Sequence, residues 1–138
     1  MDKVLIDADV ILDFFFDRKP FSNDSTKIIN LCEKGEIKGF VTSIVLSNIA
    51  YLLRKTATQE KVITTLKVLM KFIEVTPTNK NSVLDALNSD FKDFEDALQN
   101  FSAQNSEEIK VIITRNIKDY KTSKLSIMTP EIYLKSIQ

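Results

Sequence analysis

The sequence contains no histidine, and its 138 residues include a single cysteine, Cys32. Without histidine, the chain has no Ser-His-Asp or Cys-His catalytic group, no ribonuclease site built on paired histidines and no zinc site with histidine ligands. One cysteine cannot form a disulfide within the chain, and its apolar spacing with Ile28 and Ile29 favours a core thiol over a nucleophile. Any catalysis must therefore rely on carboxylates, amides, hydroxyls, lysine, arginine or a bound metal ion.

Glycine, proline and long apolar runs are also scarce. Only two glycines and three prolines occur, so the sequence predicts no long irregular loop and no disordered tail. No segment has the pattern of a signal peptide or a membrane span, and we expect a soluble, cytoplasmic protein without a membrane partner. The chain length and a hydrophobic content of 43% fit a single domain over residues 1–138.

Charge of neither sign prevails, because 19 basic residues balance 19 acidic ones. A net charge of zero does not favour a protein that coats nucleic acid by electrostatic attraction. We interpret Lys118, Lys121 and Lys124 as a solvated surface rather than a row of phosphate contacts. A functional site must therefore depend on the local arrangement of side chains.

Short apolar segments alternate with amphipathic segments along the chain. The expected strands cover residues 3–6, 40–41, 72–75, 110–113 and 125–128. The expected helices cover residues 10–16, 25–34, 42–55, 58–70, 81–88 and 94–102, with a last helix from residue 130. Asp9 is the expected N-cap of the first helix, and Gly35 is expected to end the second. This alternation predicts a three-layer α/β/α sandwich with a central parallel sheet.

The helix expected over residues 42–55 carries a polar residue on its apolar face. That face is formed by Val45, Ile49, Leu52 and Leu53, which repeat at helical spacing. Asn48 falls on the same face, between Val45 and Leu52. Because a buried amide without a partner costs about 1–3 kcal/mol, the position of Asn48 needs an explanation.

Acidic and polar residues follow the expected strand ends, where open parallel sheets bind their ligands. Asp7 ends the first strand, and Thr114, Arg115, Asn116 and Asp119 follow the strand at 110–113. Asp93 and Asp96 flank the helix at 94–102. Carboxylates crowded together repel one another and favour a divalent cation, and oxygen ligands favour Mg²⁺ or Mn²⁺. Simpler readings remain open, since Asp7 also fits a helix cap and residues 93–96 fit an acidic first turn.

Five segments together resemble the PIN-domain family, metal-dependent nucleases that include the VapC-like toxins of bacterial toxin–antitoxin pairs. The segments are VLIDADVILDFFFDR, FVTSIVLSNIAYLLRK, DFEDALQ, VIITRNIKDY and MTPEIYL, and they span nearly the whole chain in the order of the family. DFEDALQ and TRNIKDY are the most specific. Together with the PF at residues 20–21, DFEDALQ resembles a bacterial PIN subfamily.

The resemblance implies roles for individual residues. Asp7, Asp96 and Asp119 match the catalytic, metal-binding carboxylates, and Thr114 and Asn116 match polar residues that line the same pocket. The second acidic position, normally a glutamate, is matched by Asn48, which explains why this residue faces inward. Asp9 stands where the family commonly has Asn, and we infer that it partly restores the charge missing at position 48. Asp9 and Asp93 are further candidate metal ligands, and Arg115 is a candidate contact for the RNA backbone.

The function implied by the resemblance is Mg²⁺- or Mn²⁺-dependent endonucleolytic hydrolysis of single-stranded RNA. The family also implies a homodimer and an antitoxin that covers the site. Phe14, Phe15 and Phe16 are consecutive, so one helix cannot bury all three on a single face. We therefore expect at least one of these rings to reach an interface.

Two other functions remain open on the sequence. The first is a PIN-like module with little or no catalysis that binds RNA or a protein partner. The second is a phosphotransferase, because Asp7-Ala8-Asp9 resembles the D-x-D motif of haloacid-dehalogenase-type phosphatases. That motif is normally followed by Gly-Thr, whereas Val10-Ile11 follows here, which argues against the second alternative.

Overall fold

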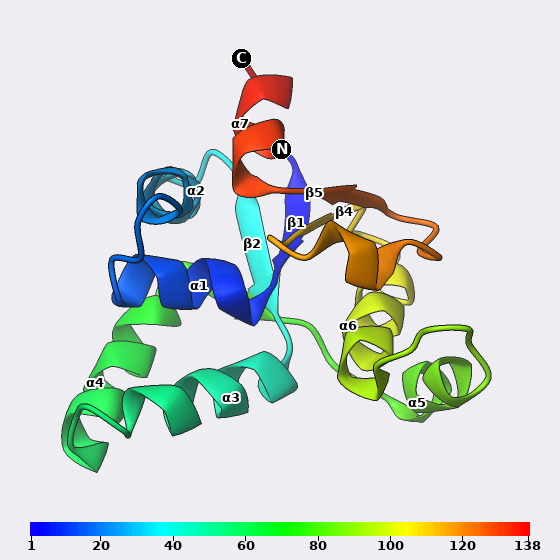
Figure 1. Cartoon of the computed structure of the whole chain (residues 1–138), viewed down its shortest axis with the longest axis horizontal. Helices are drawn as coiled ribbons and strands as arrows, with labels where there is room; N and C mark the ends of the chain where they lie inside the picture. The colour runs from blue at the N-terminus through cyan, green and yellow to red at the C-terminus, as the bar shows by residue number, and fades with distance from the viewer.

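Five short parallel strands form the central sheet of the protein (Figure 1). The computed structural model describes all residues from 1 to 138. The strands are β1 (Lys3–Ile6), β2 (Lys38–Val41), β3 (Ile73–Val75), β4 (Val111–Ile113) and β5 (Ser126–Met128). Their order in the sheet is β3-β2-β1-β4-β5. From β1, the chain first adds β2 and β3 on one side of the sheet and then adds β4 and β5 on the other. The boundary between β1 and β4 is therefore a topological switch point, where α/β folds of this kind form ligand crevices.

Seven α-helices cover the sheet on both faces (Figure 1). They are α1 (Ala8–Phe15), α2 (Ser22–Glu33), α3 (Ser43–Leu53), α4 (Gln59–Leu69), α5 (Lys80–Leu87), α6 (Phe94–Gln104) and α7 (Pro130–Ser136). A short 3₁₀ helix, η1 (Ile117–Tyr120), follows β4. Helices α1 to α4 lie on one side in Figure 1, and α5 and α6 lie on the other. The predicted α/β/α sandwich is confirmed.

The alternation of side chains along β1 explains why both faces of the sheet are covered. Val4 and Ile6 join the larger core beneath α1, α2 and α3, whereas Leu5 joins a second core with Ile112 and Tyr120. Val4, Leu5 and Ile6 are all fully buried. Successive residues of a strand point to opposite faces, so a strand with an uninterrupted apolar run such as VLI must be buried on both sides.

The first helix starts earlier than the sequence suggested. Asp7, not Asp9, is the N-cap of α1, and one of its carboxylate oxygens accepts a hydrogen bond from the Ala8 N–H at 2.8 Å. The prediction for Asp9 was wrong because the helix begins directly at the end of β1, without an intervening turn. Asp9 therefore lies in the first turn of α1. The C-terminal prediction for α2 was correct, since Gly35 follows that helix with a φ of +74°, a conformation that favours glycine.

The three consecutive phenylalanines at the end of α1 are all partly exposed. Phe14, Phe15 and Phe16 pack against the larger core without entering it fully. The guanidinium of Arg18 lies over the Phe16 ring, 5.3 Å from its centre. One helix face does not bury all three rings, as expected, while their place in an interface stays a prediction.

The register of the sheet brings the end of β1 beside the end of β4. Ile6 pairs with Ile113, and the Asp7 N–H donates to the Ile113 carbonyl at 3.0 Å. Asp7 and Thr114 are consequently the first residues beyond two neighbouring strands. None of the seven helices has both the length and the apolar character required to cross a membrane.

Candidate active site

Asp7 is held by hydrogen bonds from three elements at the end of β1. While one carboxylate oxygen caps α1, the other accepts from the Thr114 hydroxyl at 2.9 Å and from the Tyr120 hydroxyl at 3.3 Å. Thr114 is fully buried after β4, and Tyr120 is buried at the end of η1. These contacts fix the orientation of the carboxylate between α1, β4 and η1.

Asp9 continues this network toward the segment that follows β4. Its Oδ2 accepts from the Arg115 N–H at 3.1 Å and from the Asn116 side-chain amide at 3.2 Å. Its Oδ1 is buried and has no hydrogen-bond partner. Because an unsatisfied buried oxygen is costly, this atom is available to a ligand that enters the site.

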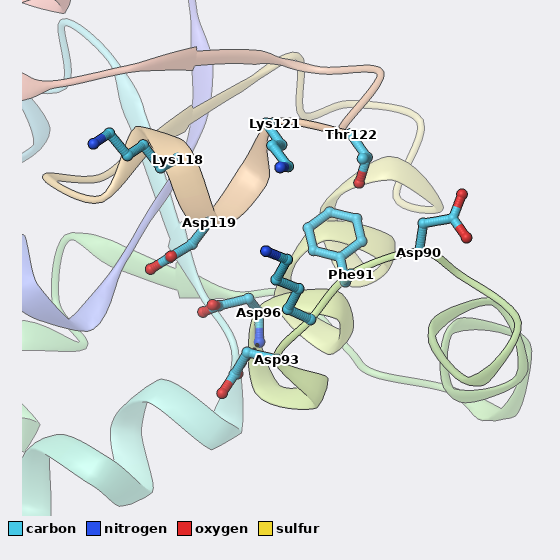
Figure 2. A pocket seen from close by; sticks show the side chains of 9 residues that line it. Asp90, Phe91, Asp93, Asp96, Lys118, Asp119, Lys121 and Thr122 are labelled. Carbon is cyan, nitrogen blue, oxygen red and sulfur yellow. Dashed lines mark hydrogen bonds between the residues drawn. The ribbon is translucent and has the colours of Figure 1, made fainter.

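Asp96 and Asp119 line a pocket of about 310 Å³ next to this network. Asp96 comes from the first turn of α6, and Asp119 comes from η1. Figure 2 shows their carboxylates pointing toward the same side of the pocket. Asp93, at the same pocket, is the N-cap of α6 and accepts from the Asp96 N–H at 2.9 Å. The simpler interpretations are therefore correct: Asp7 is a cap, and Glu95 and Asp96 lie in the acidic first turn of α6. A capping carboxylate keeps its second oxygen for other contacts.

Burial and repulsion between charges raise the pKa values of Asp7, Asp9 and Asp96. Burial raises the pKa of Asp96 to about 7, with further increases from the charges of Asp93, Asp7 and Asp119. Burial, followed by the charge of Asp7, raises the pKa of Asp9 to about 6. The pKa of Asp7 is also raised, because burial outweighs the hydrogen bonds from Thr114, Ala8 and Tyr120. Electrostatically, these carboxylates thus behave as one site that a cation would stabilise.

The donor chemistry of this edge fits Mg²⁺ or Mn²⁺. All candidate ligands supply oxygen atoms, the Oδ1 of Asp9 is unpaired, and the repelling charges favour a divalent ion. No three acidic side chains come together closely enough to form a complete metal cage. The assignment of Asp7, Asp96 and Asp119 as ligands, with Asp9 and Asp93 beside them, therefore stays a prediction.

The side chain of Arg115 has a different environment from the one expected. Its Nε lies 2.7 Å from Oδ2 of Asp13, a carboxylate with 0% exposure, and its guanidinium stacks over Phe21 at 4.1 Å from the ring centre. Because the edge of this guanidinium contacts Asp13 and its face contacts Phe21, it is a poor candidate for binding an RNA backbone. The contribution of Arg115 to the site is its N–H bond to Asp9.

Asn48 lies half-buried on α3, and its side-chain amide makes no hydrogen bond within the protein. Its apolar neighbours on the same face, Val45 and Ile49, are buried as expected. Because the Asn48 amide keeps some contact with solvent, the full cost of a buried unpaired amide does not apply. Its role at the metal stays a prediction.

Sequence reasoning missed Tyr120 and Asp13. Tyr120 directly follows Asp119, and only the tight turn of η1 sends its hydroxyl to Asp7. Asp13 lies in the apolar run of α1, where a charged residue at a buried position was itself a signal for a partner. Neither partner was identifiable without the register that brings β1 beside β4.

The sequence and the fold are both similar to those of known proteins. A family profile described as PIN domain matches residues 3–118. Ribonuclease VapC1 of Aquifex aeolicus (strain VF5) is 27% identical over 135 residues, which cover 94% of this chain and 92% of that protein. The fold is also similar to two solved structures. A toxin–antitoxin complex from Klebsiella pneumoniae gives a TM-score of 0.70 at 18% identity, covering 92% of this chain and 97% of that one. VapBC2 from Rickettsia felis, bound to a promoter DNA fragment, gives 0.66 at 15% identity, covering 91% and 96%.

Proposed function

The chain belongs to the PIN-domain family, and from that premise we propose that it is a metal-dependent endoribonuclease that hydrolyses single-stranded RNA. The observation that carries the proposal is the carboxylate network at the switch between β1 and β4. There Asp7 is fixed by Thr114 and Tyr120, and burial, together with the neighbouring charges that include Asp7, raises the pKa of Asp96. The similarity to a ribonuclease over most of both chains supports the same reading.

Asp7, Asp96 and Asp119 would hold the metal ion, with Asp9 as a further oxygen donor. A bound Mg²⁺ or Mn²⁺ would activate a water molecule and stabilise the negative charge that develops on the phosphate. Thr114 and Tyr120 keep Asp7 oriented by donating hydrogen bonds to its Oδ2. Because the pKa of Asp96 is raised to about 7, a cation that binds near neutral pH would displace a proton from this carboxyl.

An antitoxin protein is the proposed partner of the chain, which would then act as the toxin of the pair. Two proteins of similar fold were solved within toxin–antitoxin assemblies. A homodimer is part of the same proposal, with the partly exposed rings of Phe14, Phe15 and Phe16 as candidates for the contact. A molar mass measured by light scattering, for the isolated chain and for the chain co-expressed with a candidate antitoxin, tests both partners.

The enzymatic proposal is tested with protein freed from any copurifying partner. A panel of single-stranded RNAs is incubated with Mn²⁺ or with EDTA, and the products are resolved at nucleotide resolution. We expect internal cuts that require Mn²⁺. RNA binding without cleavage in either condition would instead support the non-catalytic PIN-like module.

A further inference from the structure

The pocket beside Asp96 and Asp119 has two chemically different sides (Figure 2). The carboxylates of Asp96 and Asp119 point toward one side. The ring of Phe91 and the amine of Lys121 lie on the other, near Thr122. The pocket therefore joins the acidic edge directly to a surface that offers a cation, a hydroxyl and an aromatic ring.

The lysines of this pocket form no direct ion pair with a carboxylate of the protein. Lys92, Lys118 and Lys121 line it together with four aspartates, yet none of these lysines forms an ion pair. Arg115, the arginine nearest to the carboxylate network in sequence, is already paired with Asp13. The cations free to meet a phosphate beside the acidic edge are thus those of the pocket. Figure 2 shows the amine of Lys118 pointing away from the pocket, whereas the amine of Lys121 lies beside the Phe91 ring, so Lys121 is the lysine that we pair with that ring.

Phe91 supplies a fixed aromatic surface in the same pocket. Its ring is partly exposed and makes edge-to-face contacts with Phe101 at 5.9 Å and with Tyr120 at 6.1 Å, measured between ring centres. Tyr120 in turn donates to Asp7. Phe91 in the pocket wall thus contacts Tyr120, which binds Asp7. A base stacked on Phe91 would therefore be held at a defined position relative to Asp7.

We propose that this pocket binds the nucleotide next to the phosphate that is cut, with its base against Phe91 and its own phosphate on Lys121. The proposal rests on the nuclease function proposed above and adds the direction in which the RNA leaves the acidic edge. The RNA strand would then run between α6 and η1, on the side of the sheet away from Arg115. A single-stranded ligand is required, because a paired base has no free face to stack on Phe91.

The test compares two lysines of one segment. Lys121 and Lys124 are both exposed and unpaired, but only Lys121 lines the pocket. Binding of a fluorescein-labelled, mixed-sequence single-stranded RNA is measured by anisotropy in EDTA at several salt concentrations. We expect Lys121→Ala to weaken binding several-fold and to lower the slope of log K against log[salt] by about 0.7, as for one lost phosphate contact. Lys124→Ala should match the parent in both respects.

The aromatic half of the proposal is tested with Phe91→Leu and Phe91→Tyr. Loss of one stacked base weakens binding by roughly tenfold, so the leucine variant should lose affinity while the tyrosine variant keeps it. Melting temperatures of both variants show whether the fold is intact. Equal losses in the two variants would overturn the stacking role of Phe91, because the aromatic face is retained in tyrosine.

The same proteins separate this proposal from the nuclease function. Cleavage by the parent with equal effects of Lys121→Ala and Lys124→Ala would overturn the pocket and leave the nuclease standing. RNA binding that depends on Lys121, without cleavage in Mn²⁺, would overturn the nuclease and leave the pocket as an RNA site. A parent protein that does not bind the labelled RNA would overturn the pocket proposal.

Discussion

The guanidinium of Arg115 reaches the fully buried carboxylate of Asp13, with Nε 2.7 Å from Oδ2. The Nη2 group also donates a hydrogen bond to Oδ1 at 3.2 Å. The Nε contact lies outside hydrogen-bond angles, so we treat it as a close ion pair rather than a second hydrogen bond. This pair fastens the segment after β4 to α1, and the same segment supplies the N–H that binds Asp9.

Removal of Arg115 should destabilise the protein strongly. Arg115→Ala leaves the carboxylate of Asp13 buried beside only Arg18, whose Nη1 is 3.7 Å away and whose side chain is exposed. Breaking a buried pair costs about 3–5 kcal/mol, and we expect the lower end because 27% of the Arg115 side chain is exposed. Urea unfolding measures the loss. The matched change Arg18→Ala should cost less than about 1 kcal/mol, and similar losses in both variants would contradict the role of the Arg115 pair.

A divalent cation should raise the melting temperature of the native protein. Mn²⁺ at saturating concentration should add roughly 5 °C, since it binds the folded carboxylates and relieves their repulsion. Asp96→Asn should remove this increase. Glu95→Gln, which deletes the same charge from the exposed neighbouring position, should keep it. Equal melting temperatures of the parent with Mn²⁺ and with EDTA would count against a metal site.

Without metal, stability should fall as the pH rises from about 4 to about 7. The folded pKa of Asp9 is about 6 and that of Asp96 about 7, both above the ordinary value of 3.8. The folded state consequently holds protons that the unfolded state has released, and deprotonation removes that stabilisation. Urea unfolding in EDTA across this range should show a shallower decline for Asp96→Asn. The charges that raise the pKa of Asp96, beyond burial, are those of Asp93, Asp7, Asp119 and Glu95, while Lys92, Lys118 and Lys121 line the same pocket. A parent and variant with the same pH profile would show that Asp96 does not carry a raised pKa.

The change Asn48→Glu should tighten Mn²⁺ binding and lower the stability of the metal-free protein. A carboxylate at the position of the glutamate usual in this family adds a charge and an oxygen ligand, which we expect to strengthen binding on the order of tenfold. Without metal, the added charge repels the other carboxylates. Calorimetric titration with Mn²⁺ measures the first effect and urea unfolding the second. Ser47→Glu, one residue away at an exposed position, should show neither. Unchanged Mn²⁺ affinity would mean that position 48 does not face the ion.

Much of the fold was predictable because its signals are local. The apolar run VLI of β1 favours a strand buried on both faces, and the predicted end of α2 at Gly35 follows from backbone sterics. The start of α1 was not predictable to the residue, since Asp7 and Asp9 are both acceptable caps. Only the direct junction of β1 and α1 selects Asp7.

The site was predictable in its residue types and less so in its contacts. Asp7 and Thr114 were expected together because both follow neighbouring strand ends, and they are 2.9 Å apart through a hydrogen bond. Arg115 was expected in the site for its charge, yet a longer-range partner, Asp13, holds its side chain. Pairing between residues about a hundred positions apart depends on sheet register, which local pattern does not determine.

The central claim is that the carboxylate network around Asp7 cleaves RNA, and one measurement tests it most directly. Asp7→Asn keeps an oxygen that can cap α1, so the variant should fold, which its melting temperature verifies. Single-turnover cleavage of a labelled single-stranded RNA in Mn²⁺ is then compared between parent and variant, both free of partner. We predict a rate loss on the order of 100-fold or more in Asp7→Asn. Equal rates in the two proteins would contradict the account, because the cleavage would then arise outside this network.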